Sequence, residues 1–369
     1  MRKGWEYKSF ETCINKLPKP KQVKTSEYSS GTKYPIISQE DKLISGYYDD
    51  ESYVFHIDSP VVIFGDHTRV LKYVDFDFVV GADGVKIISP KRELNAKFLL
   101  YYLQWYKIPN LGYSRHYKLL KEIKIPLPPK STQLAIVSEL DKINELIRLK
   151  KEQLKDFDNL AQSLFYEMFG DPVENEKGWE VKKLGELLKV IGGYAFKSDK
   201  YKDEGIPILR IGNINSGFFR DTNLVFAESD EKLERYKIFP GDIVISLTGT
   251  VGKSDYGNVC IMDDAYNFYY LNQRNAKLEI FGNLDKYYLS AILKNEVIKS
   301  RLTSISRGVR QANIANKDIE NLQIPLPPLS LQRLFAQRIE QIDREKSEVQ
   351  KSIQDLETLL ASRMQYWFE

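Results

Sequence analysis

The chain has 369 residues, which is too long for one ordinary hydrophobic core and suits two domains with a connecting region. Hydrophobic residues make up 42% and charged residues 28% of the sequence, which is typical of a folded protein and excludes a disordered chain. Lysine and arginine number 54 against 51 acidic residues, and a net charge of +3 is too small to identify a nucleic-acid-binding protein by itself.

Residues 1–129 are predicted to form the first of two α/β domains. They contain short apolar segments, such as residues 60–64, which are typical of strands. The domain ends in residues 125–133, which read IPLPPKSTQ. Prolines hold an extended backbone and deny helix to the residue before them, and Ser131 can cap a helix that starts next. This segment therefore predicts a strand end, a rigid elbow and a helix start.

A long amphipathic helix is predicted to follow, over residues 130–170. One frame gives an unbroken spacing of three and four residues, with a single polar member, at Leu140, Ile143, Ile147, Lys150, Leu154, Phe157, Ala161, Leu164 and Met168. A helix from residue 131 to 169 would be about 58 Å long. Gly170 and Pro172 end it before the second domain, residues 171–328.

The second half of the chain repeats the first. Residues 324–332 (IPLPPLSLQ) match residues 125–133 at seven of nine positions, 199 residues later. The final segment, residues 329–369, keeps the same helical frame, with seven of nine positions apolar or aromatic, at Ile339, Ile342, Lys346, Val349, Ile353, Leu356, Leu360, Arg363 and Trp367. The sequence GWE at residues 4–6 also recurs, at residues 178–180. The two domains are therefore predicted to be copies of each other.

Two helices with matched apolar stripes are predicted to pack on each other. The predicted fold class is α/β: two similar domains with mixed sheets, separated by two long antiparallel, coiled-coil-like helices in a pseudo-twofold cyclic arrangement. The alternative is that each helix packs only on its own domain. The regular spacing over four turns or more, without glycine or proline, favours the helix pair.

These features resemble the specificity subunits of type I restriction-modification systems, over essentially the whole chain. The resemblance rests on the doubled elbow with its helix, on residues 169–172 (FGDP), on Gly178-Trp179 and on residues 241–253 (GDIVISLTGTVGK). It implies a protein without catalysis of its own, with two target-recognition domains. Each domain would read one half of an asymmetric, interrupted sequence in double-stranded DNA. A rod of 58 Å corresponds to roughly 17 base pairs.

The resemblance also implies partners. The helices would carry two methyltransferase subunits, which use S-adenosylmethionine to methylate adenine, and restriction subunits, which use ATP and magnesium to translocate and cut DNA. No cofactor or metal is expected on this chain. Gln133 and Gln332, at the starts of the two helices, are expected to contact partner subunits. The family often has glutamate before this glutamine, whereas Thr132 and Leu331 stand here.

Candidate DNA-reading residues lie in polar loops of both domains. In the first domain they are His67, Thr68, Arg69, Arg115, His116 and Tyr117. In the second domain they are Thr248, Thr250, Lys253, Gln273, Arg274, Asn275, Arg307, Arg310 and Gln311. Arginine can pair with guanine, and asparagine or glutamine with adenine, while threonine and lysine commonly hold phosphate. Each of these residues could instead serve ordinary loop or ion-pair chemistry. Because the two sets differ, the half-sites are predicted to differ.

Competing motifs point to different classes of protein. Residues 249–254 (GTVGKS) nearly form a phosphate-binding loop of an ATP-dependent DNA enzyme, but Leu247 stands where the first glycine is needed. Glu122 and Lys124 match the end of a nuclease motif, but the repeated strand lacks both charges. His67 and His116 lack metal-ligand spacing. The pattern is also compatible with a specificity module of another restriction class, an orphan methyltransferase-targeting subunit or a structural coiled-coil adaptor.

The sequence predicts a cytoplasmic protein that does not bind membranes. Residues 1–6 lack the apolar core of a signal peptide, and the longest apolar run, residues 98–106, is too short to span a bilayer. Cys13 and Cys260 have no partner cysteines nearby, so neither a disulfide framework nor a cysteine zinc site is expected.

Overall fold

The computed structural model describes residues 4–369 apart from 32, 83, 113, 251–254 and 305–310. The chain divides into two compact units, of which unit 1 is Met1–Gln153 with Val349–Glu369 and unit 2 is Leu154–Glu348. One boundary between the units lies within helix α4 (Lys130–Phe169), and the other lies within helix α9 (Leu329–Phe368). Each unit therefore contains a globular domain, the start of one long helix and the end of the other.

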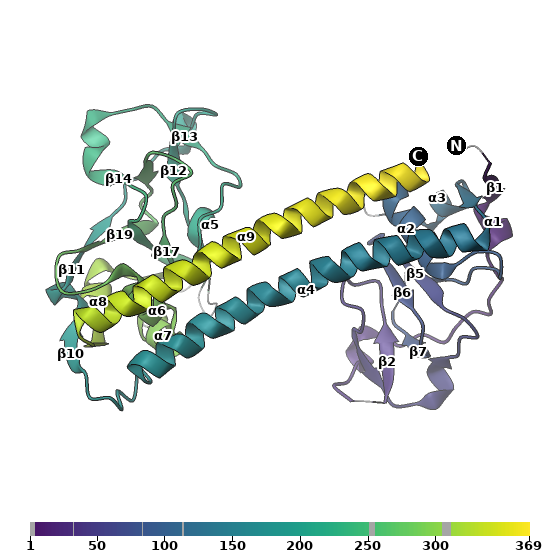
Figure 1. Cartoon of the computed structure of the whole chain (residues 1–369), viewed down its shortest axis with the longest axis horizontal. Helices are drawn as coiled ribbons and strands as arrows, with labels where there is room; N and C mark the ends of the chain where they lie inside the picture. Colours follow the sequence, from purple (N-terminus) through teal and green to yellow (C-terminus); the bar gives the residue numbers. More distant parts are fainter. Residues whose placement is uncertain (1–3, 32, 83, 113, 251–254, 305–310) are drawn as a thin grey trace. The chain divides into compact units, whose positions relative to one another are not determined.

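The described part of the domain in unit 1 is built on three small sheets. A two-stranded sheet pairs β1 with β9, a four-stranded sheet has the order β3-β2-β7-β4, and a three-stranded sheet has the order β6-β5-β8. The strands are β1 (Glu6–Ser9), β2 (Tyr34–Ile37), β3 (Gly46–Tyr48), β4 (Val54–Phe55), β5 (Val61–Gly65), β6 (Leu71–Val74), β7 (Phe78–Val80), β8 (Val85–Ile88) and β9 (Lys124–Leu127). The short helices are α1 (Phe10–Cys13), α2 (Ala96–Tyr106) and α3 (Tyr117–Lys121). Helix α2 packs on β5 and β6 (Figure 1).

Unit 2 repeats this plan in its described residues and adds to it the strand β11 and a two-stranded sheet of β16 and β20. Its sheets have the orders β10-β21, β13-β12-β18-β14, β11-β19-β15-β17 and β16-β20. The strands are β10 (Glu180–Lys183), β11 (Leu188–Gly192), β12 (Ile206–Leu209), β13 (Phe226–Ala227), β14 (Lys237–Ile238), β15 (Ile243–Ser246), β16 (Thr248–Thr250), β17 (Val259–Ile261), β18 (Tyr269–Leu271), β19 (Asn275–Ile280), β20 (Gln311–Asn313) and β21 (Gln323–Leu326). The short helices are α5 (Ile211–Ile214), α6 (Lys286–Lys294), α7 (Glu296–Thr303) and α8 (Asn316–Glu320).

The strand directions repeat as well as the strand orders. In unit 1 the central pair β2 and β7 is parallel, and β3 and β4 flank it antiparallel. In unit 2 the central pair β12 and β18 is parallel, and β13 and β14 flank it antiparallel. The predicted fold class, with two similar α/β domains, mixed sheets and two long helices, is confirmed.

The two repeated segments of each half, GWE near the start and IPLPP near the end, overlap with strands that pair with each other. In unit 1, β9 leads into the proline elbow and pairs with β1, so that Glu6 lies opposite Leu127. In unit 2, β21 pairs with β10 in the same way, with Glu180 opposite Leu326. Proline lacks an N–H donor, and a two-stranded sheet tolerates it because each strand has one edge without a partner. In both domains, the last strand therefore pairs with the first strand directly before a long helix begins.

The end of α4 is satisfied by the residues that follow it. Gly170 takes a left-handed conformation, with φ +75°, which suits a residue directly after a helix. The Trp179 indole N–H donates to the carbonyl oxygen of Phe169 at 2.8 Å, and Lys177 donates to that of Glu167 at 2.6 Å. The last carbonyl groups of a helix lack partners within it, so these contacts fix where α4 stops.

The two long helices pack against each other within each unit, in opposite directions. In unit 1, Arg363 donates to the Glu139 carboxylate, and Lys151 pairs with Glu357 at 2.9 Å. In unit 2, Lys346 pairs with Asp158 at 2.5 Å. Buried positions of the apolar stripes include Leu140, Ile143, Ile147, Leu164, Met168, Ile342, Val349 and Ile353. The core of unit 1 also joins residues of α4 and α9 with the domain, so packing on one domain alone does not describe these helices.

Candidate nucleic-acid interface

Two polar segments of unit 1, far apart in the sequence, meet at Asp66. This residue follows β5 directly, and its side chain is buried. Its carboxylate accepts a hydrogen bond from the Tyr117 amide at 2.7 Å. Its carbonyl oxygen accepts one from the His116 amide at 2.8 Å. The predicted DNA-reading segments 67–69 and 115–117 therefore lie side by side.

His116 is part of this junction and not of the surface. Its ring is completely buried, and the Leu111 amide donates to Nε2 at 3.0 Å. An amide can only donate, so Nε2 carries no proton and Nδ1 does. Nδ1 lies 2.9 Å from the Asp66 carbonyl oxygen and donates to it. Both ring nitrogens are occupied inside the domain, which corrects the prediction that His116 reads DNA directly.

Gln39, which sequence reasoning missed, holds the segment 67–69 through hydrogen bonds. Its side-chain oxygen accepts from the His67 amide at 3.2 Å, and its carbonyl oxygen accepts from the Thr68 hydroxyl at 2.6 Å. Glycines leave room for it, since a Cβ at Gly84 would lie 2.7 Å from the Gln39 Oε1. A Cβ at Gly65 would lie 2.2 Å from the Thr68 hydroxyl oxygen. The loop is therefore tightly held at its base.

A buried lysine holds the segment that carries Gln39. Lys72 is only 6% exposed, and its Nζ donates to the carbonyl oxygens of Ser38 at 2.9 Å and Lys42 at 2.5 Å. Burial lowers the pKa of Lys72. In the sequence this residue reads as an ordinary polar position of a half-exposed strand, so no local pattern could have identified it.

The predicted residues of unit 1 differ in what they can reach. Thr68 and Arg115 are exposed, while His67 and Arg69 are half-buried. The Arg69 guanidinium donates to the carbonyl oxygen of Ile108 at 3.1 Å, so it is held against the domain. Arg115 is the best placed of the set for contact with a ligand, because the Thr68 hydroxyl already donates its proton to the Gln39 carbonyl oxygen.

Tyr117 is anchored by its ring. The ring packs edge-on against Phe10, with centroids 6.1 Å apart, and tilted against Phe64 at 6.3 Å. The Lys86 ammonium lies 5.7 Å from the centre of the Tyr117 ring. Burial raises the pKa of Tyr117. The structure thus gives Tyr117 a packing role, and this argues against stacking on a base.

A depression of about 420 Å³ beside the first segment adds two further polar residues. Arg69, Gln104 and Lys107 contribute to its lining. Lys107 follows helix α2 in a left-handed conformation, with φ +48°. Sequence reasoning missed Gln104 and Lys107, because polar residues near the end of an amphipathic helix normally indicate a solvated face.

Three segments of unit 2 meet in a comparable way, around Leu247. Its amide donates to the Arg274 carbonyl oxygen at 2.8 Å, and its carbonyl oxygen accepts from the Ile314 amide at 2.9 Å. Strand β16, which follows at once, pairs antiparallel with β20 and places Thr250 opposite Gln311. The structure therefore brings together the predicted segments around Thr248, Gln273 and Gln311.

Asp255 fixes the end of β16. Its carboxylate accepts from both the amide and the hydroxyl of Thr250, each at 2.9 Å. Gly249 is required beside it, since a Cβ there would lie 2.4 Å from an Asp255 carboxylate oxygen and 2.7 Å from the Tyr256 ring. The Thr250 hydroxyl is thus oriented by a carboxylate in the same domain.

The predicted residues of unit 2 divide in the same manner. Thr250, Gln273 and Arg274 are exposed, and Thr248 is half-buried. Asn275 is completely buried, and its side-chain amide donates to the Leu209 carbonyl oxygen at 2.8 Å. Its predicted contact with DNA is therefore corrected to a role in holding the turn. Lys253, Arg307 and Arg310 lie outside the described residues.

The competing motifs receive no support from the described residues. Gly249 and Thr250 lie in a paired strand, whereas a phosphate-binding loop leads from a strand into a helix. Glu122 lies at the end of α3 and Lys124 in β9, both on the surface. In the part of the chain that the structure describes, no group of three or more His, Cys, Asp or Glu side chains is placed to hold a metal ion.

Gln133 and Gln332, predicted to contact partner subunits, are instead inside the molecule. Gln133 is 1% exposed and Gln332 is completely buried. The Gln133 amide group donates to the carbonyl oxygens of Glu93 and Pro128, and the Gln332 amide group bonds in the equivalent way. With their side chains enclosed, both have a structural role, and the expected contact is corrected accordingly.

A search of the described helices for a membrane-spanning stretch finds none that combines sufficient length with sufficient apolar character.

A family model for the type I restriction modification DNA specificity domain matches residues 3–156 and again residues 176–358. The type I restriction enzyme MjaVIII specificity subunit of Methanocaldococcus jannaschii is 27% identical over 268 residues, which are 66% of this chain and 62% of that protein. The EcoKI specificity subunit of Escherichia coli is 27% identical over 183 residues, 46% of this chain and 38% of that protein. The chain thus spans less than two thirds of the length of these relatives.

Two solved structures share the fold. The S subunit of a type I restriction-modification system from M. genitalium has a TM-score of 0.59 at 17% identity, covering 98% of this chain and 95% of that one. A chain from a study of complex assembly and conformational transition of the type I R-M system has a TM-score of 0.56 at 20% identity, covering 100% and 98%. At these identities the likeness concerns the fold alone.

Proposed function

The chain belongs to the family of type I restriction-modification DNA specificity domains, and we propose on this premise that it is the DNA-binding specificity subunit of such a system. The family resemblance drawn from the doubled elbow and helix is confirmed. In this proposal each domain reads one half of an interrupted, asymmetric target in double-stranded DNA. The observation that carries it is the duplication, because two copies of one DNA specificity domain in a single chain suit a target in two parts.

The polar loops support a role in reading bases. In unit 1, Thr68 and Arg115 are exposed on segments that Asp66 joins. In unit 2, Gln273 and Arg274 are exposed on a turn that Leu247 joins to β16. Arginine and glutamine can each make two hydrogen bonds to one base in the major groove. Because the two sets differ, the proposed half-sites differ in sequence.

We place the chemistry on partner subunits. The histidine of the junction, His116, has both nitrogens engaged and cannot act as a general base without breaking the fold. S-adenosylmethionine would bind to the methyltransferase subunits, and ATP and magnesium to the restriction subunits. The chain itself would supply position and selectivity and would hold no cofactor.

The long helices offer surface for two methyltransferase subunits. Large apolar side chains are exposed on both, at Leu134, Leu146, Leu149, Leu160, Leu334 and Leu359. Exposed apolar side chains mark a protein interface where they gather into a contiguous patch. Their occurrence on both halves of α4 and on both halves of α9 agrees with one partner for each domain.

Mapping of N6-methyladenine in the genome of a host with and without this gene tests the proposal. The expected result is a two-part sequence motif with a fixed gap, methylated in the presence of the gene and unmethylated in its absence. A gene for an active partner methyltransferase must be present in both strains. Methylation that is the same in both strains would contradict the proposal.

A further inference from the structure

Gln133 and Gln332 hold equivalent places, 199 residues apart, each at the first turn of a long helix. The Gln133 Oε1 accepts from the Asn95 amide at 2.8 Å, and its Nε2 donates to the carbonyl oxygens of Glu93 and Pro128, both at 2.9 Å. One buried amide group therefore links two backbone segments, the proline elbow and the loop before α2, to the start of α4.

Gln332 makes the same three bonds in unit 2. Its Oε1 accepts from the Asp285 amide at 2.8 Å. Its Nε2 donates to the carbonyl oxygens of Asn283 at 3.2 Å and Pro327 at 2.8 Å. All the donors and one acceptor site of each glutamine are thus used on backbone groups, and this set of bonds permits only a narrow range of orientations.

The loop held by each glutamine caps the helix that packs on the long helix. The Asn95 side chain accepts from the Phe98 amide at 3.0 Å, and the Asp285 side chain accepts from the Tyr287 amide at 2.8 Å. A change in the glutamine therefore affects the first turn of α2 or α6 directly, because the same residue that caps the helix is bonded to the glutamine.

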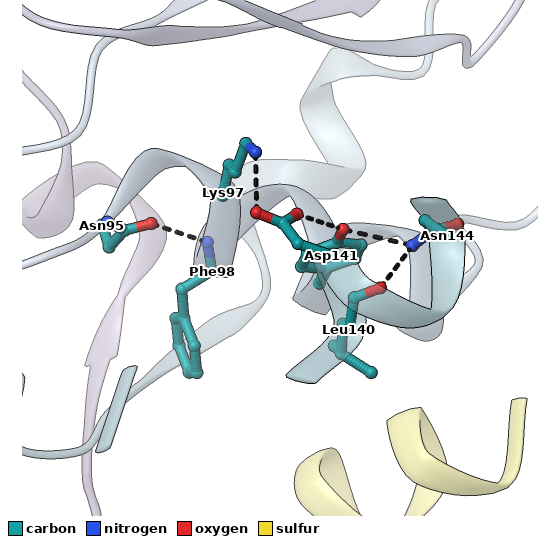
Figure 2. A network of polar contacts seen from close by, with 7 residues as sticks. Asn95, Lys97, Phe98, Leu140, Asp141 and Asn144 are labelled. Atoms are coloured by element: carbon teal, nitrogen blue, oxygen red, sulfur yellow. Dashed lines mark hydrogen bonds and ion pairs between the residues drawn. The ribbon is translucent and has the colours of Figure 1, made fainter. Parts of the chain in front are cut away.

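Figure 2 shows how α2 is then fastened along α4 in unit 1. Asp141 receives hydrogen bonds from Lys97 and from the Tyr101 hydroxyl, each at 2.7 Å. Asn144 donates to the same hydroxyl at 3.1 Å. In unit 2 the equivalent contact is a hydrogen bond between Tyr287 and Glu340. The contacts in the two units use different residues around the same glutamine.

The end of the other long helix completes each junction. The Phe368 ring of α9 lies 5.5 Å from the Phe98 ring of α2. The Phe169 ring of α4 lies 4.8 Å from the Tyr288 ring of α6. Phe169 and Phe368 are again 199 residues apart. Ring packing supplies attraction, and the three hydrogen bonds of the glutamine amide group add a restraint on orientation.

We propose that Gln133 and Gln332 are positioning residues that set the pose of each recognition domain on its helices, and thereby fix the length of the gap between the half-sites that the protein accepts. This rests on the proposed function, because a gap has meaning only for a two-part DNA target. Each glutamine acts through the domain in its own unit, and neither touches DNA.

The experiment uses the methyltransferase assembled from the full chain and its modification subunits. The probe is a duplex carrying the target found by methylation mapping, with the gap at its natural length or changed by one base pair. The variants are Gln133→Ala, Gln332→Ala and the isosteric Gln332→Glu, which keeps the acceptor but removes both donors. Gln337→Ala, at an exposed position of α9, is the matched control.

In the wild type and the control, we expect strong preference for the natural gap. In the three variants the ratio of affinities for natural and altered gaps should fall about tenfold, the effect of one or two buried hydrogen bonds. Selectivity within each half-site should stay unchanged. Unaltered gap preference in folded variants overturns the proposal, and so does equal loss of half-site and gap selectivity, which would indicate general unfolding.

Hydrogen exchange of the free protein separates this proposal from the proposed function. Amide exchange at Asp285 should accelerate in Gln332→Ala and at Asn95 in Gln133→Ala, each without effect on the other unit. If these amides stay protected, the positioning role fails, whatever the protein binds. If they exchange as expected but the wild-type complex selects no DNA sequence, the proposed function fails and its gap-reading consequence with it.

Discussion

The two domains of this chain share a common frame and differ in their polar loops. The frame is the proline elbow with its partner strand, the buried glutamine and the packing of the long helices on the domain. In both, a proline elbow pairs with a strand near the start of the domain, and a buried glutamine bonds that elbow to a helix cap. The segments that carry the exposed polar residues are held quite differently. Asp66 and His116 join two loops in unit 1, whereas in unit 2 the pairing of β16 with β20 and the Asp255 carboxylate do so.

This difference indicates which part of the fold is free to vary. The frame must match both long helices, so its strand pairing and its glutamine bonds are repeated with the same atoms. The sequence of each loop is constrained by what its own domain binds, so the same frame can carry loops of different specificity. Substitutions in the frame should therefore have matched effects in the two units, while substitutions in the loops should affect one unit only.

The largest effect is expected from Phe169→Ala. This ring is 3% exposed and lies about 5 Å from the rings of Tyr288 and Phe335, at 4.8 and 5.2 Å. Removing a buried aromatic ring should lower the free energy of unfolding by about 3–5 kcal/mol. Urea denaturation gives the total, and hydrogen exchange should locate the loss in unit 2.

The matched substitution in unit 1 is Phe368→Ala, and it should destabilise unit 1 in the same way. Leu160→Ala, at a position that is 51% exposed, is the control and should change stability little. If Phe169→Ala loosened unit 1 more than unit 2, the equivalence of the two frames would be refuted.

Asp66→Ala should affect the polar loops of unit 1 and leave those of unit 2 unchanged. Without the carboxylate, the Tyr117 amide loses its acceptor in a partly buried position, and the two polar segments separate. We expect a loss of about 2 kcal/mol in unit 1. Recognition of one half-site should weaken while the other remains, as measured by methylation of duplexes with substitutions in either half.

Asp66→Asn is the graded variant, because its side-chain oxygen can still accept from Tyr117. It should retain most of the binding that Asp66→Ala loses. Equal damage to both half-sites in either variant would mean that the junction supports the whole protein and not one reader.

Gly193→Ala should disturb the loops of unit 2 more mildly. A Cβ at Gly193 would lie 2.2 Å from the Asn272 carbonyl oxygen, so the turn that carries Gln273 and Arg274 must shift. Crowding of this kind costs about 1–3 kcal/mol. Methylation kinetics should show weaker recognition of the half-site read by unit 2. Gly212→Ala, where a Cβ meets nothing within 4 Å, should behave like the wild type in this assay.

The frame could be predicted from the sequence because its sequence pattern occurs in two copies. The elbows, the helix bounds and the matched stripes each appear in two copies, and a repeated pattern is visible without coordinates. Repetition also singled out Gln133 and Gln332, but it did not say what they contact. Their partners include backbone groups of Asn95 and Asp285, which carry no sequence signal. The sequence therefore suggested contacts with partner subunits, whereas the structure has hydrogen bonds within the chain.

The loops were predicted less well, for a physical reason. Polar side chains that bind ligands and polar side chains that hold loops are chemically alike, and burial decides between them. His116 and Asn275 have the right chemistry but lie inside. Gln39 and Lys72 act across about thirty residues of sequence, through carbonyl groups, and neither belongs to a repeated or spaced motif.

The smallest effect is expected from Glu139→Gln, which tests an asymmetry within the frame. Glu139 accepts hydrogen bonds from Arg363 and from the Trp367 indole N–H. The positions 199 residues away are Arg338 and Leu164, so unit 2 has no such pair at this place. The Arg363 guanidinium, followed by the Trp367 N–H, holds the pKa of Glu139 below its ordinary value of 4.5.

A carboxyl group with a lowered pKa in the folded state stabilises the fold above its unfolded pKa, and this contribution disappears as the pH falls through the folded value. Wild type should therefore exceed Glu139→Gln in stability at pH 7, by less than about 1 kcal/mol for a partly exposed pair. The difference should shrink steadily below pH 4.5. Urea denaturation at pH 7 and pH 3 measures it, and hydrogen exchange should assign it to unit 1. A difference of the same size at pH 7 and pH 3 would show that the stability does not come from the charge of Glu139, since only the charge titrates.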